Sequence, residues 1–260
     1  MPRWSRIVVT GATSGVGEAF ARLAPADAAL LLSGRDTAKL AALAGELGGA
    51  RTVETIAADL SVAEGRAALI DAAAAFEPDL LINNAGFGVY GQALDNPIDG
   101  EIGMVETNAR APIELTRALA PAMIAKARDG RGRAGVVFVS SIVAFAPFPR
   151  YATYAATKAF INSYAEALAE EQRDEPIDIL ALCPGATRTA FHARSGNAFD
   201  GPMDSAERVA REGYAAIGRR VVHVVNPRNK LVAGVIGNAP RSLMTRAIGA
   251  AMRRRRPAAE

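Results

Sequence analysis

Short apolar runs alternate with helix-like segments along almost the whole chain, and this alternation constrains the fold more than any other feature. Apolar runs predict strands at residues 7–10, 29–33, 52–57, 80–83, 136–140, 177–183 and 221–225. Helical patterns lie between them, near residues 15–24, 37–48, 62–75, 99–127, 152–174 and 204–218. Continuous apolar runs of this kind are typical of strands that are covered on both faces. The pattern therefore predicts an α/β fold, a doubly wound parallel sheet of about seven strands with helices on both faces.

The length and composition fit one α/β domain with a C-terminal addition. Single α/β domains often reach 260 residues, and a chain that is 50% apolar and 22% charged has ample material for a buried core. We expect the main domain to span residues 1–240, and a helix with an arginine-rich tail to span residues 241–260. Residues 186–203 show no clear period, which is typical of a mobile lid this late in an α/β chain.

The composition excludes several classes of protein. The one cysteine, Cys183, cannot form an internal disulfide, and the two histidines, His192 and His223, lie far apart in the sequence, so we expect no metal site. No stretch reaches the ~18 apolar residues of a membrane-spanning helix. The first residues also lack the basic-then-apolar pattern of a signal peptide. We therefore expect a cytoplasmic protein without a membrane span.

The net charge of +3 comes from the end of the chain. Residues 253–256 are all arginine, and without these four positive charges the remaining chain carries −1. A run of like charges is usually a solvated tail. The basic excess therefore does not indicate a nucleic-acid-binding face, and we expect no nucleic-acid partner.

A glycine-rich turn follows the first predicted strand. The segment reads Thr10-Gly11-Ala12-Thr13-Ser14-Gly15-Val16-Gly17, with the spacing GxxxGxG. Glycines at a strand-to-helix turn let the backbone approach a ligand, and the free N–H groups at the start of the next helix suit a pyrophosphate. A tight turn that needs positive φ is the alternative interpretation. The position directly after the first strand favours dinucleotide binding.

The end of the second predicted strand favours NADPH over NADH as the dinucleotide. An acidic residue at this strand end typically binds the ribose 2′-hydroxyl, but here the sequence reads Ser33-Gly34-Arg35-Asp36. A guanidinium beside the adenosine ribose suits a 2′-phosphate, through bidentate charge-assisted hydrogen bonds. Asp36 is better explained as the N-cap of the next helix than as the ribose ligand, because a helical pattern follows it.

Tyr154 and Lys158 form a Tyr-x-x-x-Lys pair on a predicted helix, so their side chains lie on the same face. A nearby cation favours the phenolate and lowers the pKa of tyrosine, and such a tyrosine exchanges a proton with a carbonyl or alcohol oxygen. Ser141 follows a predicted strand 13 residues earlier, where a parallel sheet presents its site. An exposed helix pair is the alternative, but it leaves the position of Ser141 unexplained.

Together these motifs resemble those of the short-chain dehydrogenase/reductase family. The matching positions are the turn at 10–17, Asp59-Leu60, Asn83-Asn84-Ala85-Gly86, Asn108, Ser141, Tyr154 with Lys158, and Pro184-Gly185 with Thr189. The resemblance covers about residues 5–225 and, in finer detail, extends to bacterial NADP-preferring short-subunit carbonyl reductases. It implies a Rossmann-type fold, a nicotinamide cofactor and the interconversion of carbonyl and alcohol by hydride transfer.

The resemblance also implies residue roles. Tyr154 is the general acid in reduction and the base in the reverse direction, Ser141 hydrogen-bonds the substrate oxygen, and Lys158 lowers the pKa of Tyr154. Asn108 is expected to hold a water that links Lys158 to solvent. The implied cofactor contacts are Gly11, Thr13, Ser14, Gly15, Val16 and Gly17 at the adenosine and pyrophosphate, Arg35 at the 2′-phosphate, Asp59 and Leu60 at the adenine, Asn83, Ala85 and Gly86 on the adenosine side, Tyr154 and Lys158 at the nicotinamide ribose, and Pro184, Gly185, Thr187 and Thr189 at the nicotinamide end.

Five apolar side chains follow the motif positions: Phe87, Val143, Phe145, Phe148 and Phe191. If they line a pocket, the substrate carries an apolar part, and ordinary packing is the alternative. The expected partner is a small-molecule carbonyl or alcohol. The resemblance further suggests a homodimer or homotetramer that assembles through residues 99–127 and 152–174.

An NADPH-dependent carbonyl reductase is the leading hypothesis. An NAD-linked alcohol dehydrogenase would use the same set of Asn108, Ser141, Tyr154 and Lys158. A regulatory protein that binds NADPH without turnover is a third possibility, and the complete catalytic set counts against it. A sugar-nucleotide epimerase needs a larger substrate domain than 260 residues allow.

Overall fold

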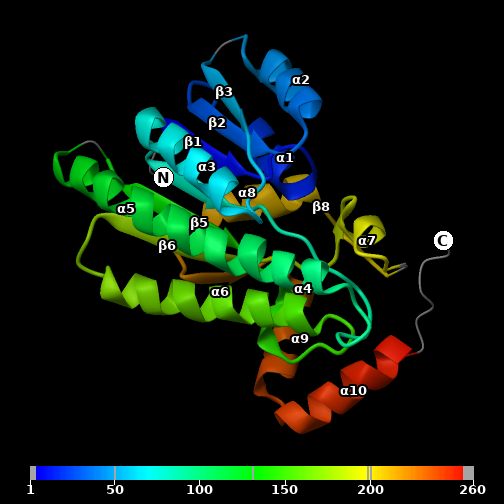
Figure 1. The fold of residues 1–260 in the computed structure, drawn as a ribbon. Coiled ribbons are helices and arrows are strands. Elements are labelled where there is room, and N and C mark those ends of the chain that lie inside the picture. Colours follow the sequence, from blue (N-terminus) through cyan, green and yellow to red (C-terminus); the bar gives the residue numbers. More distant parts are fainter. Residues whose placement is uncertain (1–3, 50, 131, 198, 200, 254–260) are drawn as a thin grey trace.

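One seven-stranded parallel sheet forms the centre of the molecule, in the computed structural model that describes residues 4–49, 51–130, 132–197, 199 and 201–253 (Figure 1). The strand order is β3-β2-β1-β4-β5-β6-β9, and each neighbouring pair is parallel. The strands are β1 (Arg6–Thr10), β2 (Ala29–Gly34), β3 (Val53–Ala57), β4 (Leu80–Asn83), β5 (Ala134–Val139), β6 (Ile177–Cys183) and β9 (Val222–Val224). The predicted doubly wound α/β fold is confirmed.

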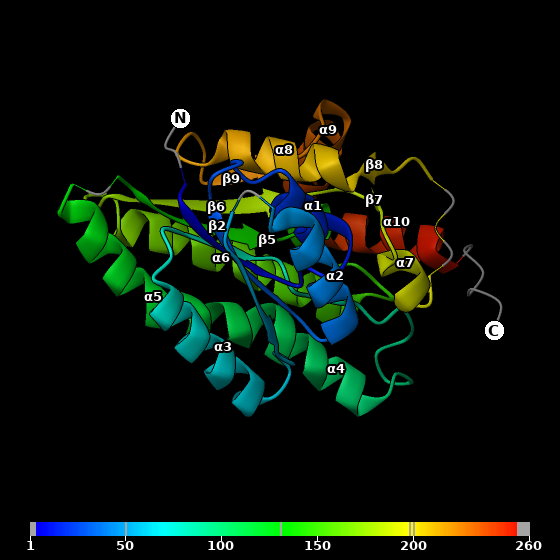
Figure 2. The same cartoon turned by 90° about the horizontal axis from the view of Figure 1, so that it is seen from above.

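Helices cover both faces of this sheet, as Figure 2 shows from above. One face packs against α1 (Gly15–Arg22), α2 (Thr37–Leu47) and α8 (Ala206–Ala216), and the other against α3 (Ala63–Phe76), α5 (Ala111–Arg128) and α6 (Ala152–Glu171). The strands are apolar throughout because their side chains alternate between these two layers. In β1, Ile7 and Val9 join the first core and Val8 joins the second.

The long helix predicted at 99–127 is divided into three parts. These are α4 (Ile98–Val105), one π-helical turn η1 (Glu106–Arg110) and α5. Pro112 follows η1 and lacks the N–H that would donate to the carbonyl four residues earlier, so the regular hydrogen-bond ladder is open there. The π-helical turn places Asn108 in the interior, where it is 1% exposed.

The segment after β6, predicted to be irregular, contains short regular elements. These are β7 (Thr187–Arg188), the single turn α7 (Phe191–Arg194) and β8 (Asp204–Ser205). β7 and β8 pair in parallel, with Thr187 opposite Asp204, so the two ends of the segment are tied together. Lid motion in this segment stays a prediction.

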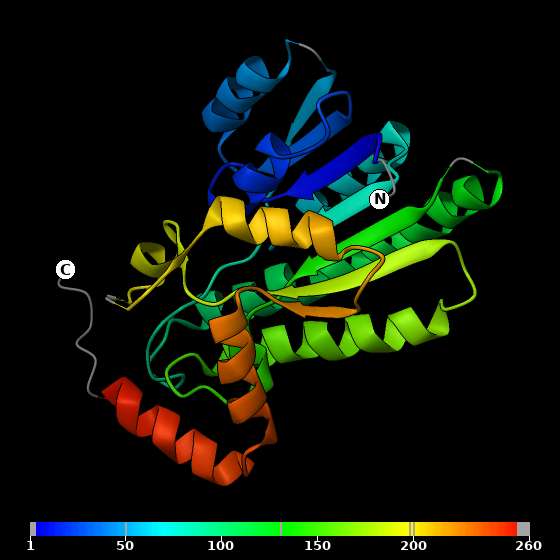
Figure 3. The same cartoon turned by 180° about the vertical axis from the view of Figure 1, so that it is seen from behind.

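The chain continues after β9 as two helices, α9 (Pro227–Asn238) and α10 (Arg241–Arg253), which lie at the β9 end of the sheet (Figure 3). Met252 of α10 is buried, and its carbonyl accepts a hydrogen bond from Tyr90 Oη at 3.3 Å. α10 is therefore packed on the main domain. Of the predicted arginine tail, Arg253 ends this helix, and residues 254–256 lie outside the described residues. Among the described helices, none is both long enough and apolar enough to cross a membrane.

Candidate active site

A cavity of about 800 Å³ opens at the carboxyl ends of the strands. This edge is where open α/β sheets bind their ligands, and the volume is that of a typical small-molecule site. Of the predicted site residues, those that line the cavity are Gly11, Thr13, Ser14, Gly15, Val16, Arg35, Asp59, Leu60, Ala85, Gly86, Phe87, Ser141, Val143, Phe148, Tyr154, Lys158, Pro184, Gly185, Thr187, Thr189 and Phe191. The structure thus brings together residues that span almost 180 positions of the sequence.

The glycine-rich turn connects β1 to α1 and forms one end of the cavity. Gly11 and Gly15 have φ values of +66° and +60°, a region that favours glycine. A Cβ at Gly11 would lie 2.9 Å from the Cα of Ala85, and a Cβ at Gly15 would lie 2.8 Å from Cγ2 of Thr189. α1 begins at Gly15, and the side chain of Ser14 makes no capping bond to it. The first N–H groups of α1 are therefore available to an anion, which fits a pyrophosphate.

Two of the predicted cofactor contacts do not line the cavity. A Cβ at Gly17 would lie 2.3 Å from the carbonyl oxygen of Gly11, so this glycine is required for α1 to pack on the turn. Asn83 is buried in β4, and its Nδ2 donates to Thr116 Oγ1 of α5 at 3.3 Å. Neither residue borders the cavity, because these side-chain positions face neighbouring elements, and their contact with the cofactor stays a prediction. Asn84 lines the cavity instead, and its Nδ2 donates to the carbonyl of Thr10 at 2.8 Å.

Arg35 follows β2 and borders the cavity beyond the glycine-rich turn. Its side chain is 69% exposed, and its Nη1 lies 3.8 Å from Oδ2 of Asp59. Asp36 caps α2 by accepting a hydrogen bond from the N–H of Lys39 at 3.0 Å, as predicted. An exposed guanidinium that borders the cavity, together with the open helix start, fits an adenosine 2′-phosphate and pyrophosphate.

Ser141, Tyr154 and Lys158 converge on the middle of the cavity. Ser141 follows β5 and caps a short 3₁₀ helix, η2 (Ile142–Phe145), by accepting from the N–H of Val143 at 3.3 Å. Its hydroxyl lies near enough to the Tyr154 phenol to act on the pKa of that group. Lys158 lies one turn further along α6, with Nζ 5.7 Å from the centroid of the Tyr154 ring. A hydroxyl, a phenol and an amine thus meet around one point.

Burial dominates the titration of this group. Tyr154 and Lys158 are 9% and 5% exposed. Desolvation raises the pKa of Tyr154 above its ordinary value, and the nearby Ser141 hydroxyl only partly opposes this change. Desolvation also lowers the pKa of Lys158 to about 8. The Lys158 ammonium donates to the carbonyl of Val139 at 2.8 Å. That Lys158 lowers the pKa of Tyr154 stays a prediction.

Asn108 joins the loop after β4 to α6. Its Oδ1 accepts from the N–H of Phe87 at 3.1 Å, and its Nδ2 donates to the carbonyl of Phe87 at 2.9 Å and to Thr157 Oγ1 at 3.2 Å. Asn108 does not itself line the cavity, and it fixes the segment that carries Gly86 and Phe87. The predicted water between Asn108 and Lys158 stays a prediction.

The wall of the cavity around Tyr154 is aromatic. Tyr154 packs with Met104 and Tyr151 in a cluster that also includes Phe87, Val89, Tyr90, Val143, Phe148 and Phe191. Four of the five predicted apolar residues line this wall. Phe145 does not line it, because η2 turns the Phe145 side chain toward α9. The Cβ of Phe145 would lie 3.8 Å from a Cβ added at Gly237 of α9.

Cys183 is buried, and burial raises the pKa of its thiol to about 12. This is the behaviour of a core residue.

The sequence patterns missed several residues of the cavity wall. Tyr151 precedes α6, and Asn229, Val232 and Met252 belong to α9 and α10. Tyr151 lies three residues before Tyr154, one helical turn away, and this spacing was an available signal. The residues of α9 and α10 carried no such signal, because only the three-dimensional path of the chain brings them to the cavity.

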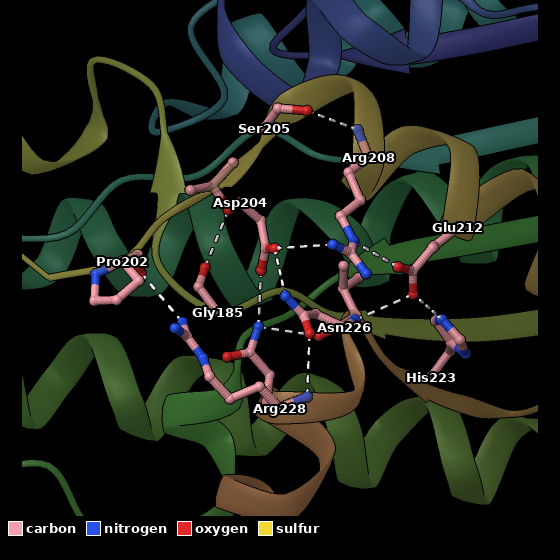
Figure 4. Close-up of polar contacts among 12 residues, drawn as sticks. Gly185, Pro202, Asp204, Ser205, Arg208, Glu212, His223, Asn226 and Arg228 are labelled. Atoms are coloured by element: carbon pink, nitrogen blue, oxygen red, sulfur yellow. Dashed lines mark hydrogen bonds and ion pairs between the residues drawn. The ribbon is translucent and has the colours of Figure 1, made fainter.

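A polar network fixes the base of α9 against the segment that carries Thr187 (Figure 4). The buried carboxylate of Asp204 accepts from Asn226 Nδ2 at 2.7 Å and from Asn229 Nδ2 at 2.9 Å. Glu212 of α8 accepts from Asn226 N–H at 3.2 Å and lies 3.0 Å from Nε2 of His223. The network connects β8, α8, β9 and α9, and it therefore positions the part of the cavity wall that contains Thr187 and Asn229.

Comparison with known proteins agrees with this geometry. The family model described as short chain dehydrogenase matches residues 5–198. The chain is 33% identical over 240 residues to "Dehydrogenase/reductase SDR family member 7B" of Bos taurus, covering 84% of this chain and 72% of the relative.

Two solved structures are also similar. "Short-chain dehydrogenase from Sphingobium yanoikuyae in complex with NADPH" has a TM-score of 0.75 and 26% identity, and the match covers 92% of this chain and 97% of that one. The 3-ketoacyl-(acyl-carrier-protein) reductase from Brucella melitensis complexed with NADH has a TM-score of 0.75 and 28% identity, covering 86% and 96%. The chain therefore belongs to the short-chain dehydrogenase/reductase family of NAD(P)-dependent oxidoreductases.

Proposed function

We propose that the protein reduces a ketone or aldehyde to an alcohol with NADPH, and that Tyr154 is the general acid. The convergence of Ser141, Tyr154 and Lys158 on one cavity, which also contains the glycine-rich turn, is the observation that carries the proposal. A hydride donor must lie between the glycine-rich turn, which fits the phosphates, and Tyr154, which is the proton donor. Both border this one cavity.

Each side chain has a definite part in the reaction. The nicotinamide cofactor supplies the hydride when it is bound. Tyr154 gives its phenolic proton to the carbonyl oxygen of the substrate, and Ser141 donates a hydrogen bond to the same oxygen. Lys158 contributes positive charge beside the phenol, which favours the phenolate left after proton transfer. Asn108 keeps the loop of Gly86 and Phe87 against α6, so the cavity wall stays in place.

The protonation state of Tyr154 fits the role of a general acid. A general acid must be protonated before it acts, and the raised pKa of Tyr154 keeps the phenol protonated at neutral pH. We propose the direction from carbonyl to alcohol because a preference for NADPH, which Arg35 supports, favours reduction.

Arg35 supports NADPH as the cofactor. Its guanidinium borders the cavity after β2, where a dinucleotide fold receives the adenosine ribose, and no acidic residue occupies the strand end itself. Asp59 lies close to Arg35, and a carboxylate near the ribose is the feature that would instead allow NADH. An NAD-linked alcohol dehydrogenase is therefore the second candidate.

The aromatic wall indicates a substrate with an apolar part. Phe87, Phe148, Phe191 and Met252 lie on the side of the cavity that faces Tyr154, and they offer no charged group to a polar substrate arm. We propose that this part of the cavity binds the apolar arm of a small-molecule ketone or aldehyde.

A cofactor titration combined with a substrate panel tests the proposal. Affinities for NADPH and NADH are measured for the wild type and for Arg35→Ala, and turnover is measured on ketones and aldehydes of increasing apolar size. A 2′-phosphate contact is worth roughly 10- to 150-fold in affinity. We expect an NADPH preference that is lost in Arg35→Ala. Equal affinities in the wild type would favour the NAD-linked enzyme, and tight NADPH binding without turnover of any carbonyl would refute the enzymatic proposal.

A further inference from the structure

Arg194 brings a cation against the glycine-rich turn from the opposite side of the cavity. It ends α7, and its Nη2 donates to Ser14 Oγ at 2.8 Å, although the two residues are 180 positions apart. Both residues line the cavity, and α7 extends beyond the start of α1 at the carboxyl edge of the sheet (Figure 2). Within the part of the chain that the structure describes, no carboxylate pairs with Arg194.

The contact between Arg194 and Ser14 leaves hydrogen-bond donors unused, and these donors favour the binding of an anion. Ser14 makes no capping bond to α1, so its hydroxyl accepts from Arg194 and retains its own hydrogen for another acceptor. A guanidinium has five N–H donors, and this contact uses one of them. The first N–H groups of α1 lie beside Ser14. The Arg194 guanidinium, the Ser14 hydroxyl and the first N–H groups of α1 thus lie together. Among the described residues, no charged acceptor lies beside them.

We propose that Arg194 is a phosphate ligand of the bound cofactor, so that α7 closes against the nucleotide. The inference rests on the proposed cofactor site. Arg194 is exposed, and an exposed bond between arginine and serine contributes little by itself. A phosphate oxygen changes this balance, because charge-assisted bonds from arginine to phosphate are about twice as strong as neutral ones. The target is either the pyrophosphate or the 2′-phosphate, since both present the same oxygens.

The neighbouring residue connects the same turn to the substrate side. Ser195 Oγ lies 2.8 Å from Tyr151 Oη, and the carbonyl of Ser195 accepts from the N–H of Tyr90 at 2.8 Å. The Tyr151 ring is 5.6 Å from that of Tyr154 between centroids. Arg194 and Ser195 thus link the phosphate end of the cavity to its aromatic wall. A phosphate held by Arg194 would stabilise the wall before the substrate arrives.

Binding measurements on Arg194→Met test the proposal without any turnover. The matched control is Arg188→Met, because Arg188 lies in the same segment, is exposed and does not line the cavity. NADPH and NADH are titrated by calorimetry into the wild type and both variants, with folding checked by thermal melting. We expect Arg194→Met to weaken NADPH binding about tenfold, Arg194→Lys to restore part of the affinity, and Arg188→Met to change it less than about twofold.

The two nucleotides distinguish the two phosphates. An equal loss for NADPH and NADH assigns Arg194 to the pyrophosphate, and a loss for NADPH alone assigns it to the 2′-phosphate. Unchanged affinity for both, or the same loss in Arg188→Met, would overturn the proposal. The titration of the wild type against Arg35→Ala is a separate test. If the wild type shows no NADPH preference, the proposed cofactor choice is refuted. The role of Arg194 is then still decided by the Arg194 variants.

Hydrogen exchange tests the closure of α7. NADPH should slow exchange in residues 189–197 of the wild type, and this protection should be largely lost in Arg194→Met at saturating NADPH. Equal protection in both proteins would show that α7 closes without Arg194, which would overturn that part of the proposal.

Discussion

Replacing Arg66 with methionine should destabilise the protein far more than replacing Arg110. Arg66 of α3 is only 1% exposed, and its guanidinium bonds Glu114 Oε2 at 2.8 Å, Glu106 Oε2 at 2.9 Å and the carbonyl of Leu60 at 3.1 Å. Arg110 contacts the same two carboxylates at 3.4 and 2.7 Å but is 54% exposed. The two arginines therefore share their partners and differ mainly in burial.

The expected magnitudes follow from this difference. Breaking a buried ion pair by removing one partner costs about 3–5 kcal/mol when the remaining charge stays buried. Glu106 and Glu114 are 22% and 33% exposed and regain water, so we expect a loss of about 2–3 kcal/mol for Arg66→Met. An exposed pair contributes less than about 1 kcal/mol, which sets the expectation for Arg110→Met.

Thermal and urea unfolding of both variants check the prediction. For a chain of this size the loss in Arg66→Met corresponds to a fall in Tm of roughly 4–12 °C. Methionine retains the length of the apolar stem, so the comparison isolates the guanidinium. Similar shifts for Arg66→Met and Arg110→Met would refute the reasoning from burial.

Three further predictions concern the site, its supports and the assembly. Lys158→Met should stabilise the protein by at most about 3 kcal/mol, because burial lowers the pKa of Lys158 from 10.5 to about 8. Between pH 8 and 10.5 the native wild type binds fewer protons than its unfolded state. The stability advantage of Lys158→Met over the wild type should therefore be full below pH 8 and fade toward pH 10.5 in urea titrations. If Lys158 is not desolvated, the variant should show no such advantage at any pH. Asp204→Ala should cost about 2 kcal/mol and raise KM more than it lowers kcat, since it frees two amides that position α9; unchanged stability and KM would contradict this. Ile102→Glu should reduce the oligomer size measured by light scattering, because Ile98, Ile102 and Val105 expose apolar surface on a helix predicted to mediate assembly, and an unchanged mass would exclude that face.

The sheet and the phosphate turn could be predicted because their signals are local. Each strand is a short apolar run, and all seven occur where the alternation of apolar and helical segments placed them. Gly11 and Gly15 adopt positive φ directly after β1, as their spacing indicated. Tyr154 and Lys158 lie on the same side of α6 because helical geometry alone determines this.

The remaining features depend on contacts between distant segments. The interruption of the long helix at η1 followed from Pro112 together with the bonds between Asn108 and the loop of Phe87, and helical periodicity alone does not show such bonds. The raised pKa of Tyr154 depends on burial by aromatic residues from four segments, and a sequence neighbour such as Lys158 does not reveal it. The contact of Arg194 with Ser14 arises from the path of the chain between β7 and β8.

Comparison of Tyr154→Phe with Tyr164→Phe tests proton donation by Tyr154 most directly. Both residues belong to α6, but Tyr164 packs against Phe138 and does not line the cavity. NADPH affinity is measured by titration, and reduction of the best ketone of the panel is followed by loss of NADPH absorbance. We predict that Tyr154→Phe binds NADPH like the wild type and loses turnover by about 100-fold or more, whereas Tyr164→Phe retains it. Turnover by Tyr154→Phe at the wild-type rate would contradict the account.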